Sequence, residues 1–587
     1  RVAAAVDPAG RSGRLGDTAF EPCTTTKRVA PGIQGYMQEH IDPSHLPDEA
    51  NRPDRFHSLP ELHYPAELNA AVELVDRHVE AGRGEDVAIY FEGEAITYAD
   101  LARRVNRVGN VLLDLGVEPG HRVFVRFPNR PEYVVSVLAA QKIGAVPVPS
   151  MKLLRAGEIG YVLGDSGATA AVVYDDLLEE VTAATAEHED ASLEEILVLD
   201  RNGVDHDCHD YDDLTAAADD DLAAHDTHRE DAVLLAYTSG TTGRQKGTLH
   251  THRQMLAIAD GYANYCLDPT PEDVFTSNAP LAFTFGYGFL VTFPFRVGAS
   301  TLIIQDPDAD SLLSGIDEYD VSLVAAPPTA YNQMMAGSER LAEQYDLSSL
   351  RMGVSAGEPL PPETYERARE ELGIELSDGI GTTEMLHIFI SHRLDDEMDP
   401  TATGYPVPGY ECRVVDPDTG EEQPRGEAGL LQVRGPTGIT YWDRPDKQRE
   451  TVTDGWSSPG DIFVHREDGR FEYKSRRGDL IITSGYNVPG PEVEDVLQER
   501  EEVHQSAVVG SPDEVRGKIV KAFVVLAESA EASSGLTDAL QEHVKERIAP
   551  YKYPRAVEYV DELPTTETGK IMRAKLRERE RERAASE

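Results

Sequence analysis

The sequence predicts an α/β protein with a large multi-lobed N-terminal domain, made of two α/β sheets plus a β-rich subdomain, and a small C-terminal α+β domain. The chain has 587 residues, too many for one hydrophobic core, so two or more domains are expected. Up to about residue 410, apolar strands alternate with helical segments, which is typical of mostly parallel sheets covered by helices. Beyond it come short alternating strands, and from residue 489 a compact unit of helices and strands.

The first part of the chain is polar and irregular. Residues 1–32 contain arginines but no apolar stretch of the kind a secretory signal requires, so a secretory signal is not expected. We expect this terminal segment to be disordered. Residues 33–75 are rich in Pro, Asp and His and are also expected to be irregular. The first regular element is an amphipathic helix in LNAAVELVDRHVEAG (68–82), whose apolar residues have helical spacing.

Strands and helices then follow one another closely. Residues 85–117 predict a strand, a turn, a strand and a helix. Strands in HRVFVRF (121–127) and AVPVPS (145–150) enclose the helical PEYVVSVLAAQKIGA (131–145), which indicates a β-α-β unit. Further strands, many with helical segments between them, are predicted in ATAAVVY (168–174), EILVLD (195–200), DAVLLAY (231–237), STLIIQ (300–305), VSLVAAP (321–327) and LRMGVSA (350–356).

The pattern changes in the last third of the chain. ECRVVDPDTGE (411–421), AGLLQVRG (428–435) and residues 461–485 predict short strands joined by Asp-Gly-type turns, hence a β-rich subdomain. The C-terminal unit contains a helix at 491–500, strands at 506–512 and 521–528, and a helix at 536–548. The final charged run, MRAKLRERERER (572–583), is expected to be a solvated helix or a frayed tail.

The charge composition excludes two classes of partner. Lys and Arg number 55 against 105 Asp and Glu, a net charge of −50, and a field of this sign repels nucleic acid and anionic membranes. No run of about 18 apolar residues predicts a transmembrane helix. Acidity along nearly the whole chain predicts a halophilic protein, with an acidic mesophilic protein as the alternative. Four widely separated cysteines (Cys23, Cys208, Cys266, Cys412) indicate neither a zinc site nor disulfides, and favour a reducing cytoplasm.

The strand DAVLLAY leads into YTSGTTGRQKG (237–247), a glycine-rich loop with hydroxyl side chains and a lysine. Small residues let a backbone approach a phosphate chain, amide and hydroxyl groups supply donors, and a lysine supplies positive charge. The Walker loop does not match, because glycine follows the lysine. Taken alone, the segment is either a phosphate-binding loop or a flexible surface linker. Its candidate ATP-binding residues are Thr238, Ser239, Gly240, Thr241, Thr242, Gly243 and Lys246.

Four further segments decide between these alternatives. DGIGTTE (378–384), SPGD (458–461), YKSRRGDLIITSG (473–485) and PTTETGKIMR (564–573) follow the loop in order along the chain. With the loop, they resemble the motifs of the adenylate-forming superfamily, which includes acyl-CoA synthetases, luciferases and peptide-synthetase adenylation domains. The resemblance covers about residues 60–580 and implies an adenylate-forming domain at 33–476 and a mobile C-terminal lid at 479–587.

The resemblance implies roles for single residues and a reaction that uses ATP, Mg²⁺ and CoA. Thr383 is expected to contact phosphate and Glu384 to hold Mg²⁺, for which a carboxylate is a suitable hard ligand. Asp461 is expected to accept hydrogen bonds from the ribose, and Lys570 to act at the α-phosphate, although each of these two residues alone would suggest a mere turn. A carboxylic acid would form an acyl-AMP with release of pyrophosphate, and the CoA thiol would then displace AMP. The other predicted nucleotide-binding residues are Gly381, Thr382 and Arg476.

Other segments suggest the acid. Residues 280–300, 355–361 and 378–392 are similar to the benzoate branch of acyl-CoA synthetases, and residues 62–77, 151–159 and 246–256 to 2-aminobenzoate–CoA ligases. Aromatic walls beside small residues also fit a flat ring, although core packing is the alternative for each aromatic residue. Benzoate, 2-aminobenzoate, hydroxybenzoates, cinnamates and medium-chain fatty acids all remain open. The candidate acyl-pocket residues are Phe283, Phe285, Gly286, Ala356, Gly357 and His387, the last a polar group at the far end of the ring or a buried structural histidine.

For CoA, the resemblance implies that Gly485 and Tyr486 lie beside the pantetheine arm, and Arg516 is a candidate partner for a nucleotide phosphate. The rival functions are transfer to another acceptor, an oxidative luciferase-like step, and a nucleotide-binding regulator without catalysis.

The boundary between the two domains has two possible alignments. An ungapped match makes Arg476 the ribose residue and puts Gly478 at the hinge, where glycine absorbs large backbone rotations. A shift by one residue gives these roles to Arg477 and Asp479.

Overall fold

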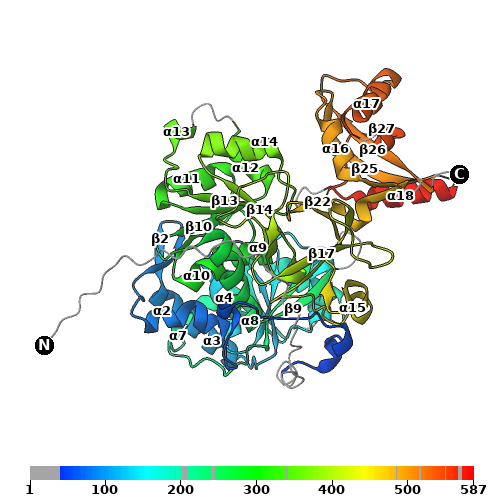
Figure 1. Ribbon diagram of the computed structural model, residues 1–587. Helices are drawn as coiled ribbons and strands as arrows, with labels where there is room; N and C mark the ends of the chain where they lie inside the picture. Colours follow the sequence, from blue (N-terminus) through cyan, green and yellow to red (C-terminus); the bar gives the residue numbers. More distant parts are fainter. Residues whose placement is uncertain are drawn as a thin grey trace.

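The structure is a computed structural model that describes residues 40–191, 193–200, 208–238, 245–336, 341–483, 486–513, 517–548, 550–565 and 571–586. Figure 1 shows a large body, and a smaller C-terminal body with α16, α17 and α18 at its upper right. The predicted α/β class with a large N-terminal and a small C-terminal part is confirmed. Residues 1–32, predicted to be disordered, lie outside the described residues. In the described part, no helix is both long enough and apolar enough to span a membrane.

The first described residues form short helical turns before the first sheet. Three 3-10 turns, η1 (Pro43–His45), η2 (Glu49–Asn51) and η3 (Pro60–Leu62), fit the expected irregular segment. The predicted amphipathic helix is present as a π-helical turn, η4 (Val72–Asp76), followed by α2 (Arg77–Glu80).

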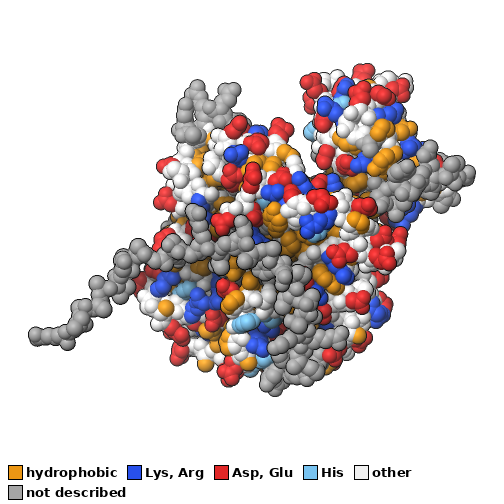
Figure 2. Space-filling view, in the orientation of Figure 1, with side chains coloured by type: hydrophobic (Ala, Val, Ile, Leu, Met, Phe, Trp, Pro, Cys, Tyr) orange, Lys and Arg blue, Asp and Glu red, His pale blue; other side chains and the backbone are white. Residues whose placement is uncertain are grey.

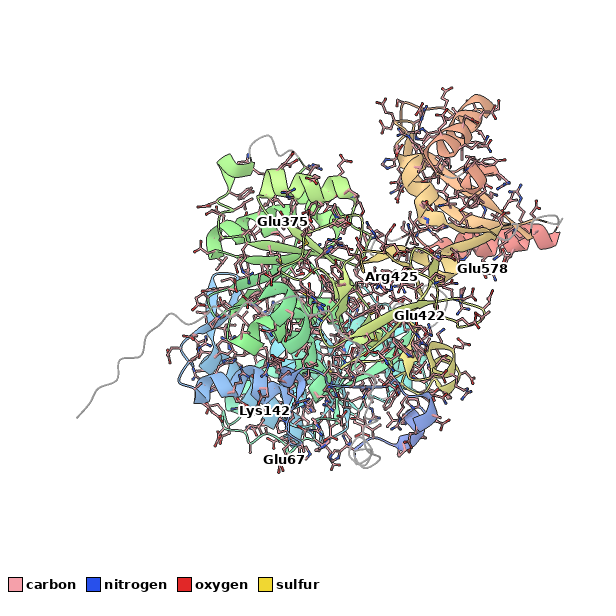
Figure 3. The ribbon with its side chains drawn as sticks, viewed as in Figure 1. Glu67, Lys142, Glu375, Glu422, Arg425 and Glu578 are labelled. Carbon is pink, nitrogen blue, oxygen red and sulfur yellow. The ribbon has the colours of Figure 1, made fainter. Side chains whose placement is uncertain are left out.

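A five-stranded parallel sheet has the order β4-β3-β5-β6-β7. The predicted β-α-β unit is confirmed, since β3 and β4 pair in parallel on either side of α4. Lys142, labelled in Figure 3, ends α4 and is buried with its Nζ 2.7 Å from Asp76 Oδ2. The elements are α3 (Tyr98–Asp114), β3 (Arg122–Arg126), α4 (Pro131–Lys142), β4 (Val146–Ser150), α5 (Ala156–Ser166), β5 (Ala170–Tyr174), α6 (Leu178–Glu187), β6 (Glu195–Leu199), β7 (His209–Asp210) and α7 (Tyr211–Ala217).

A nine-stranded sheet, β16-β15-β14-β13-β12-β10-β11-β1-β2, forms the centre of the large body. Its middle strands are parallel and its edge pairs are antiparallel. The strands are β1 (Val87–Phe91), β2 (Glu94–Thr97), β10 (Val274–Ser277), β11 (Ser300–Leu302), β12 (Leu323–Ala326), β13 (Met352–Ala356), β14 (Leu376–Gly381), β15 (Ile388–Ser391) and β16 (Tyr405–Pro406).

Helices cover both faces of this sheet, because alternate strand residues are apolar on both sides. Val324 packs with α11, α12 and α14, whereas Leu323 packs with the aromatic residues of η7 and α10 on the other face (Figure 1). The helices are α8 (His252–Ile258), the π-helical η6 (Ala259–Leu267), α9 (Thr284–Tyr287), the π-helical η7 (Gly288–Thr292), α10 (Phe293–Val297), α11 (Ala309–Tyr319), α12 (Pro328–Met334), α13 (Leu341–Gln344), α14 (Pro362–Arg367) and the π-helical η8 (Ala368–Leu372).

The strand before the glycine-rich loop differs from expectation. It is present as β8 (Ala232–Thr238), but among the described strands it joins no parallel sheet and pairs antiparallel with β9 (Lys246–Thr251). The short connection explains the difference, because only a hairpin lets a strand return after so few residues. Thr238 lies opposite Lys246 in this pair, close to the described ends of the connection.

The predicted β-rich subdomain is confirmed as an antiparallel six-stranded sheet. Its elements are β17 (Glu411–Val415), β18 (Ala428–Arg434), α15 (Pro445–Thr451), β19 (Val452–Thr453), β20 (Trp456–Ser457), β21 (Asp461–His465) and β22 (Phe471–Arg476), and a 3-10 turn, η10 (Arg477–Asp479), follows.

The C-terminal body is a three-stranded sheet with helices and a small hairpin. Its elements are β23 (Leu480–Thr483), β24 (Tyr486–Pro489), α16 (Gly490–Gln498), β25 (Val503–Asp513), β26 (Gly517–Leu526), α17 (Ser534–Arg547), a 3-10 turn η11 (Pro550–Lys552), β27 (Ala556–Tyr559) and α18 (Arg573–Ser586). The charged run 572–583 is indeed helical, but the expectation of a fully solvated helix is wrong. Leu576 and Glu580 are each only 3% exposed, and Glu580 binds the buried Lys521 Nζ at 2.7 Å, so one face docks on the sheet.

Carboxylates are spread over the whole visible face of the molecule, on both bodies, with arginines and lysines between them (Figure 2). The same view is hollowed between the C-terminal body and the lobe that carries α13 and α14. On this face, acidity is thus shared by both bodies and is not confined to one segment.

Candidate active site

The segment DGIGTTE forms the end of β14 and a tight 3-10 turn, η9 (Thr383–Met385). Thr382 caps the turn, since its Oγ1 accepts the N–H of Met385 at 3.1 Å. Gly381 is required here, because a Cβ would lie 2.8 Å from the backbone of His387, where the chain doubles back. The return passes through Leu386 at φ +71°, a strained conformation for a bulky residue.

Glu384 points from this turn toward charged and hydroxyl groups of two other elements. Tyr441 donates a hydrogen bond from Oη to Glu384 Oε1 at 3.1 Å, and burial together with this carboxylate raises the pKa of the Tyr441 phenol. Burial and the neighbouring Lys447 lower the pKa of the Lys246 ammonium, which Glu384 partly offsets. Among the residues that the structure describes, Glu384 Oε2 accepts no hydrogen bond. The turn therefore brings one carboxylate oxygen close to Lys246 without pairing it.

Asp461 and Arg476 face each other across β21 and β22. Arg476 Nε lies 3.0 Å from Asp461 Oδ1, and the Asp461 side chain is 1% exposed while that of Arg476 is 46% exposed. The Asp461 carboxylate is the main cause of the raised pKa of the Arg476 guanidinium, and the Glu384 carboxylate raises it further. Arg477 points elsewhere, donating to the Pro417 carbonyl at 3.2 Å. The structure thus brings Glu384, Lys246, Asp461 and Arg476 together from three sheets.

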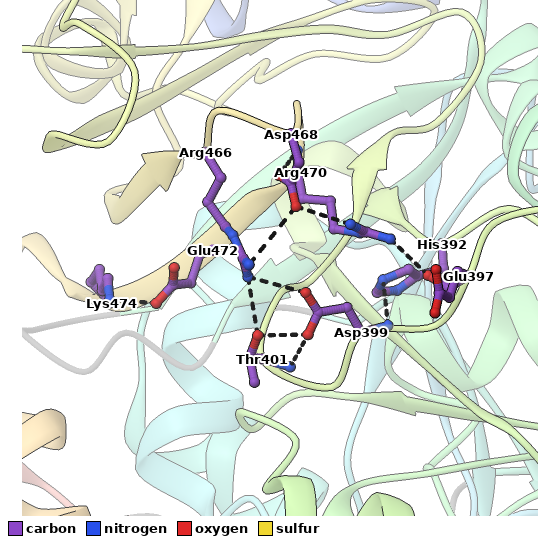
Figure 4. A network of polar contacts seen from close by, with 9 residues as sticks. All are labelled: His392, Glu397, Asp399, Thr401, Arg466, Asp468, Arg470, Glu472 and Lys474. Atoms are coloured by element: carbon purple, nitrogen blue, oxygen red, sulfur yellow. Dashed lines mark hydrogen bonds and ion pairs between the residues drawn. The ribbon is translucent and has the colours of Figure 1, made fainter.

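A polar network fixes the segment after β15 against the hairpin of β21 and β22 (Figure 4). Arg466 Nη1 lies 3.2 Å from Asp399 Oδ2, and Arg470 donates to the Glu397 carbonyl at 2.9 Å. The backbone N–H of Asp399 donates in turn to His392 Nε2 at 3.4 Å. These contacts hold the segment after β15 against the hairpin whose first strand, β21, carries Asp461.

The predicted acyl pocket centres on His387, three residues after Glu384. Its imidazole is 2% exposed and contacts three rings: Phe285 (centroids 5.4 Å apart), Phe293 (4.6 Å) and Tyr262 (5.5 Å). Burial lowers its pKa to about 3, so the ring is neutral at physiological pH. Nε2 lies 3.4 Å from the Phe285 carbonyl, and Nδ1 has no hydrogen-bond partner within the described part of the chain.

Two glycines permit close packing here, Gly288 against the imidazole and Gly286 against the backbone before α9. A Cβ on Gly288 would lie 2.4 Å from His387 Cδ2, and one on Gly286 would lie 2.2 Å from the Pro280 carbonyl oxygen. Tyr262 comes from η6 and Gly288 from η7, so both π-helices supply a neighbour of the imidazole.

The remaining predicted acyl residues lie at the same end of the central sheet. Ala356 ends β13 opposite Gly379 of β14, and Gly357 follows at φ +87° with open space around its Cβ position. Phe283 caps α9, two residues before Phe285, and is half-buried. Only Phe285 of this pair has a ring contact with His387 among the described residues.

Several predicted site residues lie outside the described residues: Ser239, Gly240, Thr241, Thr242, Gly243, Gly485, Arg516 and Lys570. Tyr486 begins β24, where its backbone is opposite Thr483. The roles of these residues remain predictions.

The two hinge candidates, Gly478 and Asp479, lie where the chain passes from contacts with the β-rich sheet to contacts with the C-terminal body. Arg477 is held by the β-rich sheet through the Gly460 and Pro417 carbonyls, at 2.8 Å and 3.2 Å. Asp479 instead pairs with Arg577 of α18. Gly478 is the residue between these two attachments.

Two residues that the geometry places beside the site were not predicted from the sequence. Tyr441 is bonded to Glu384, and His250 Nε2 donates to the Thr383 carbonyl at 2.8 Å. His250 lies between Leu249 and Thr251 in β9, and Tyr441 lies in an irregular segment, so neither has a distinctive local signal. Only the pairing of distant segments makes them neighbours of Glu384.

Comparison with known families shows to which family the chain belongs. Residues 75–442 match the AMP-binding enzyme family and residues 492–570 match the AMP-binding enzyme C-terminal domain. The chain therefore belongs to the AMP-binding enzyme family.

Three relatives resemble the chain over most of its length. The benzoate–CoA ligase of Thauera aromatica is 36% identical over 527 residues, 89% of this chain and 98% of the relative. The crystal structure of the anthranilate CoA ligase AuaEII in complex with anthranoyl-AMP has 34% identity and a TM-score of 0.81, and covers 90% of this chain and 100% of that chain. A benzoate CoA ligase structure from Burkholderia xenovorans LB400 has 34% identity and a TM-score of 0.76, with 87% and 99% covered.

Proposed function

We propose that the protein is an ATP-dependent aromatic acid–CoA ligase that forms an acyl-AMP and then an acyl-CoA, releasing pyrophosphate and AMP. The observation that carries this proposal is that Glu384 stands three residues from His387, so one tight turn separates a charged cluster from an aromatic pocket. The charged side suits a nucleotide and the aromatic side suits a flat, uncharged ring. The similarity to benzoate and anthranilate CoA ligases supports the same class of acid.

In the first step, a carboxylate oxygen of the acid attacks the α-phosphorus of ATP. The bond from this phosphorus to the bridging oxygen breaks, and pyrophosphate leaves with the electron pair. Lys246 supplies positive charge at the base of the glycine-rich loop, next to Glu384. Asp461 and Arg476 would hold the ribose, with Asp461 as the acceptor and Arg476 orienting its carboxylate. We assign Lys570 to the α-phosphate on the strength of its motif.

Glu384 is the residue that would hold Mg²⁺. The fit rests on Oε2, which accepts no hydrogen bond within the described part of the chain, while Tyr441 fixes the carboxylate through Oε1. A hard oxygen ligand of this kind suits Mg²⁺, which usually binds one or two carboxylates and substrate phosphates. When bound, the ion would neutralise charge on the phosphate oxygens.

The acyl pocket would select acids by shape and neutrality. His387 is neutral, buried and surrounded by three rings, so it favours an apolar ring and offers Nδ1 as its one free polar atom among the described contacts. The pocket provides no buried charge for an aliphatic amine or a second carboxylate from these residues. This supports benzoate, 2-aminobenzoate or hydroxybenzoate as the substrate.

In the second step, the CoA thiol attacks the acyl carbon, the bond to the AMP oxygen breaks, and the thiol proton is lost to solvent. We propose that the C-terminal body moves between the two steps and that Gly478 is the pivot. The attachment of Arg477 to one body and of Asp479 to the other supports this choice over Asp479. Gly485, Tyr486 and Arg516 stay the candidates for CoA contacts.

We also propose that the enzyme works in a cytoplasm of high salt concentration. A net charge of −50, spread over both bodies, supports this because salt screens the mutual repulsion of exposed carboxylates.

A panel of carboxylic acids tests the function. We would measure AMP and pyrophosphate release with ATP, Mg²⁺ and CoA in molar KCl for benzoate, 2-aminobenzoate, 4-hydroxybenzoate, cinnamate, octanoate and acetate. We expect both products and an acyl-CoA of the correct mass with one or more of the benzoates, and little with the aliphatic acids.

Two controls make the assay decisive. Omitting CoA should leave enzyme-bound acyl-AMP and one turnover of pyrophosphate. Formation of ADP, or release of no pyrophosphate with any acid by folded protein, would refute the proposal, and preference for octanoate would refute only its aromatic part.

A further inference from the structure

We propose that Asp165 is a positioning residue for ATP, which fixes both described ends of the glycine-rich loop. This inference rests on the proposed function and deepens it. Asp165 lies near the end of α5, in the five-stranded lobe, and no motif of the sequence analysis includes it. It reaches the β8–β9 hairpin through two tyrosines and an arginine.

The carboxylate of Asp165 holds the first end of the loop. Its Oδ2 accepts the hydroxyl of Tyr237 at 2.8 Å, and Tyr237 directly precedes Thr238. Burial and this carboxylate raise the pKa of the Tyr237 phenol far above its ordinary value, so the hydroxyl remains a donor. The position of Thr238 in β8 is therefore tied to α5.

The same helix holds the second end. Tyr161, one turn before Asp165, donates from its hydroxyl to the carbonyl of Gln245 at 3.0 Å, and Gln245 directly precedes Lys246. Arg444 bonds both the Tyr161 hydroxyl and Asp165 Oδ1, so it joins the two contacts. Both loop ends thus depend on one group of three side chains.

Trp442 completes the arrangement. Its indole N–H donates to the Asp165 backbone carbonyl at 2.9 Å, and its own backbone N–H donates to the Gly247 carbonyl at 2.9 Å. A Cβ on Gly247 would lie 3.1 Å from the Tyr237 ring and 3.2 Å from Trp442 Cβ, so glycine permits this close approach. Next to Trp442 in the chain is Tyr441, which binds Glu384. The cluster therefore links the loop to the carboxylate of the site.

Stability alone does not account for an aspartate here. Asp165 lies in the last turn of α5, just before Gly167, which ends the helix at φ +60°. A negative charge is unfavourable at a helix C-terminus, and its side chain is only 8% exposed. The pairing with Arg444 compensates for this cost. In return, the arrangement fixes the orientation of both described ends of the loop.

Asp165→Asn and Tyr237→Phe test the inference. Asparagine keeps the shape and an acceptor for Tyr237 but loses the charge that binds Arg444. We expect the KM for ATP to rise about tenfold in Asp165→Asn and about threefold in Tyr237→Phe, because one charge-assisted and one neutral hydrogen bond are lost. The KM for the aromatic acid should change by less than about twofold. Binding of α,β-methylene-ATP, measured by calorimetry, should weaken by the same factors.

Asp190→Asn is the matched control, since Asp190 is exposed after α6 and the substitution removes the same charge. It should leave the KM for ATP unchanged. An unchanged KM for ATP in both test variants would overturn the inference, and so would a rise in both KM values together with a lower Tm, which indicates a purely structural role. Failure of the proposed function can be distinguished from failure of this inference. If the proposed function is wrong, the wild type releases no pyrophosphate with any acid, but binding of the ATP analogue still tests the role of Asp165.

Discussion

The proposed site has a nucleotide half and an acyl half, which begin three residues apart, at Glu384 and His387, yet they are built differently. The nucleotide half consists of paired charges, such as Asp461 with Arg476, and the guanidinium of that pair is 46% exposed. The acyl half consists of rings packed around a neutral imidazole that is 2% exposed. The difference shows that orientation in one half comes from directional polar contacts, whereas in the other it comes from excluded volume.

Glu384→Gln should have the largest effect and should act only on the nucleotide half. The substitution keeps the size and the acceptor for Tyr441 but removes the charge, so we expect kcat to fall about 100-fold. The dependence of the rate on Mg²⁺ concentration should shift to higher values, measured by pyrophosphate release at saturating ATP. Glu422→Gln, on an exposed residue labelled in Figure 3, is the control and should have no effect. Normal kcat in Glu384→Gln would remove Glu384 from the mechanism.

Gly288→Ala should disturb only the acyl half. The backbone at Gly288 is helical, so alanine adds no strain of its own, but its Cβ would lie 2.4 Å from His387 Cδ2. Overpacking of this kind costs about 2 kcal/mol, hence we expect kcat/KM for the aromatic acid to fall about 30-fold. The binding of α,β-methylene-ATP should not change. Gly157→Ala, at a position with open space, is the matched control. Equal losses for acid and nucleotide would mean that the two halves are not separable.

Asp461→Asn should have a smaller effect, on the nucleotide half. The amide retains one acceptor but no longer attracts Arg476, so we expect the KM for ATP to rise about tenfold. The KM for the acid should stay constant, which steady-state kinetics with each substrate varied would show. Asp418→Asn, on an exposed residue after β17, should behave as wild type. A rise in the KM for the acid, with an unchanged KM for ATP, would show that Asp461 does not belong to the nucleotide half.

The smallest effect concerns the pH dependence of stability. Burial lowers the pKa of His387 from 6.5 to about 3, so between these values the unfolded chain binds more protons than the native protein. The stabilisation is present above about pH 6.5 and is lost as the pH falls toward 3, at up to about 1.4 kcal/mol per pH unit. His387→Gln should therefore give a shallower decline of the urea midpoint between pH 7 and pH 5. An identical decline in wild type and variant would show that His387 is accessible to protons in the native state.

Sequence reasoning anticipated most of the fold because its signals are local. Alternating apolar strands and helices, such as those around α4, give parallel sheets almost independently of context. It mistook the last helix for a solvated one, because the run 572–583 is charged nearly throughout, and only tertiary packing buries Leu576 and Glu580. It also did not predict the β8–β9 hairpin, because β9, which contains His250 and Thr251, lacks the apolar pattern by which a strand is recognised in a sequence.

The candidate site divides in the same way. Lys246 was predictable because the composition of its loop suits a phosphate, and Glu384 and Asp461 because their segments resemble family motifs that follow the loop in order. Tyr441 and Asp165 were not, since a single tyrosine or aspartate has many ordinary uses. Their positions become meaningful only through bonds to Glu384 and Tyr237.

The sequence by itself determined the chemical groups of this protein: a hydroxyl- and glycine-rich loop, the carboxylates and arginines of four ordered motifs, and an acidic surface, because these depend on residue type and local spacing. The tertiary structure alone decided which of these groups meet. It brought Glu384, Lys246 and Arg476 together from three separate sheets and left His387 neutral among aromatic rings. The physical reason is that charge and ring packing act over a few ångströms of space, whatever the separation along the chain.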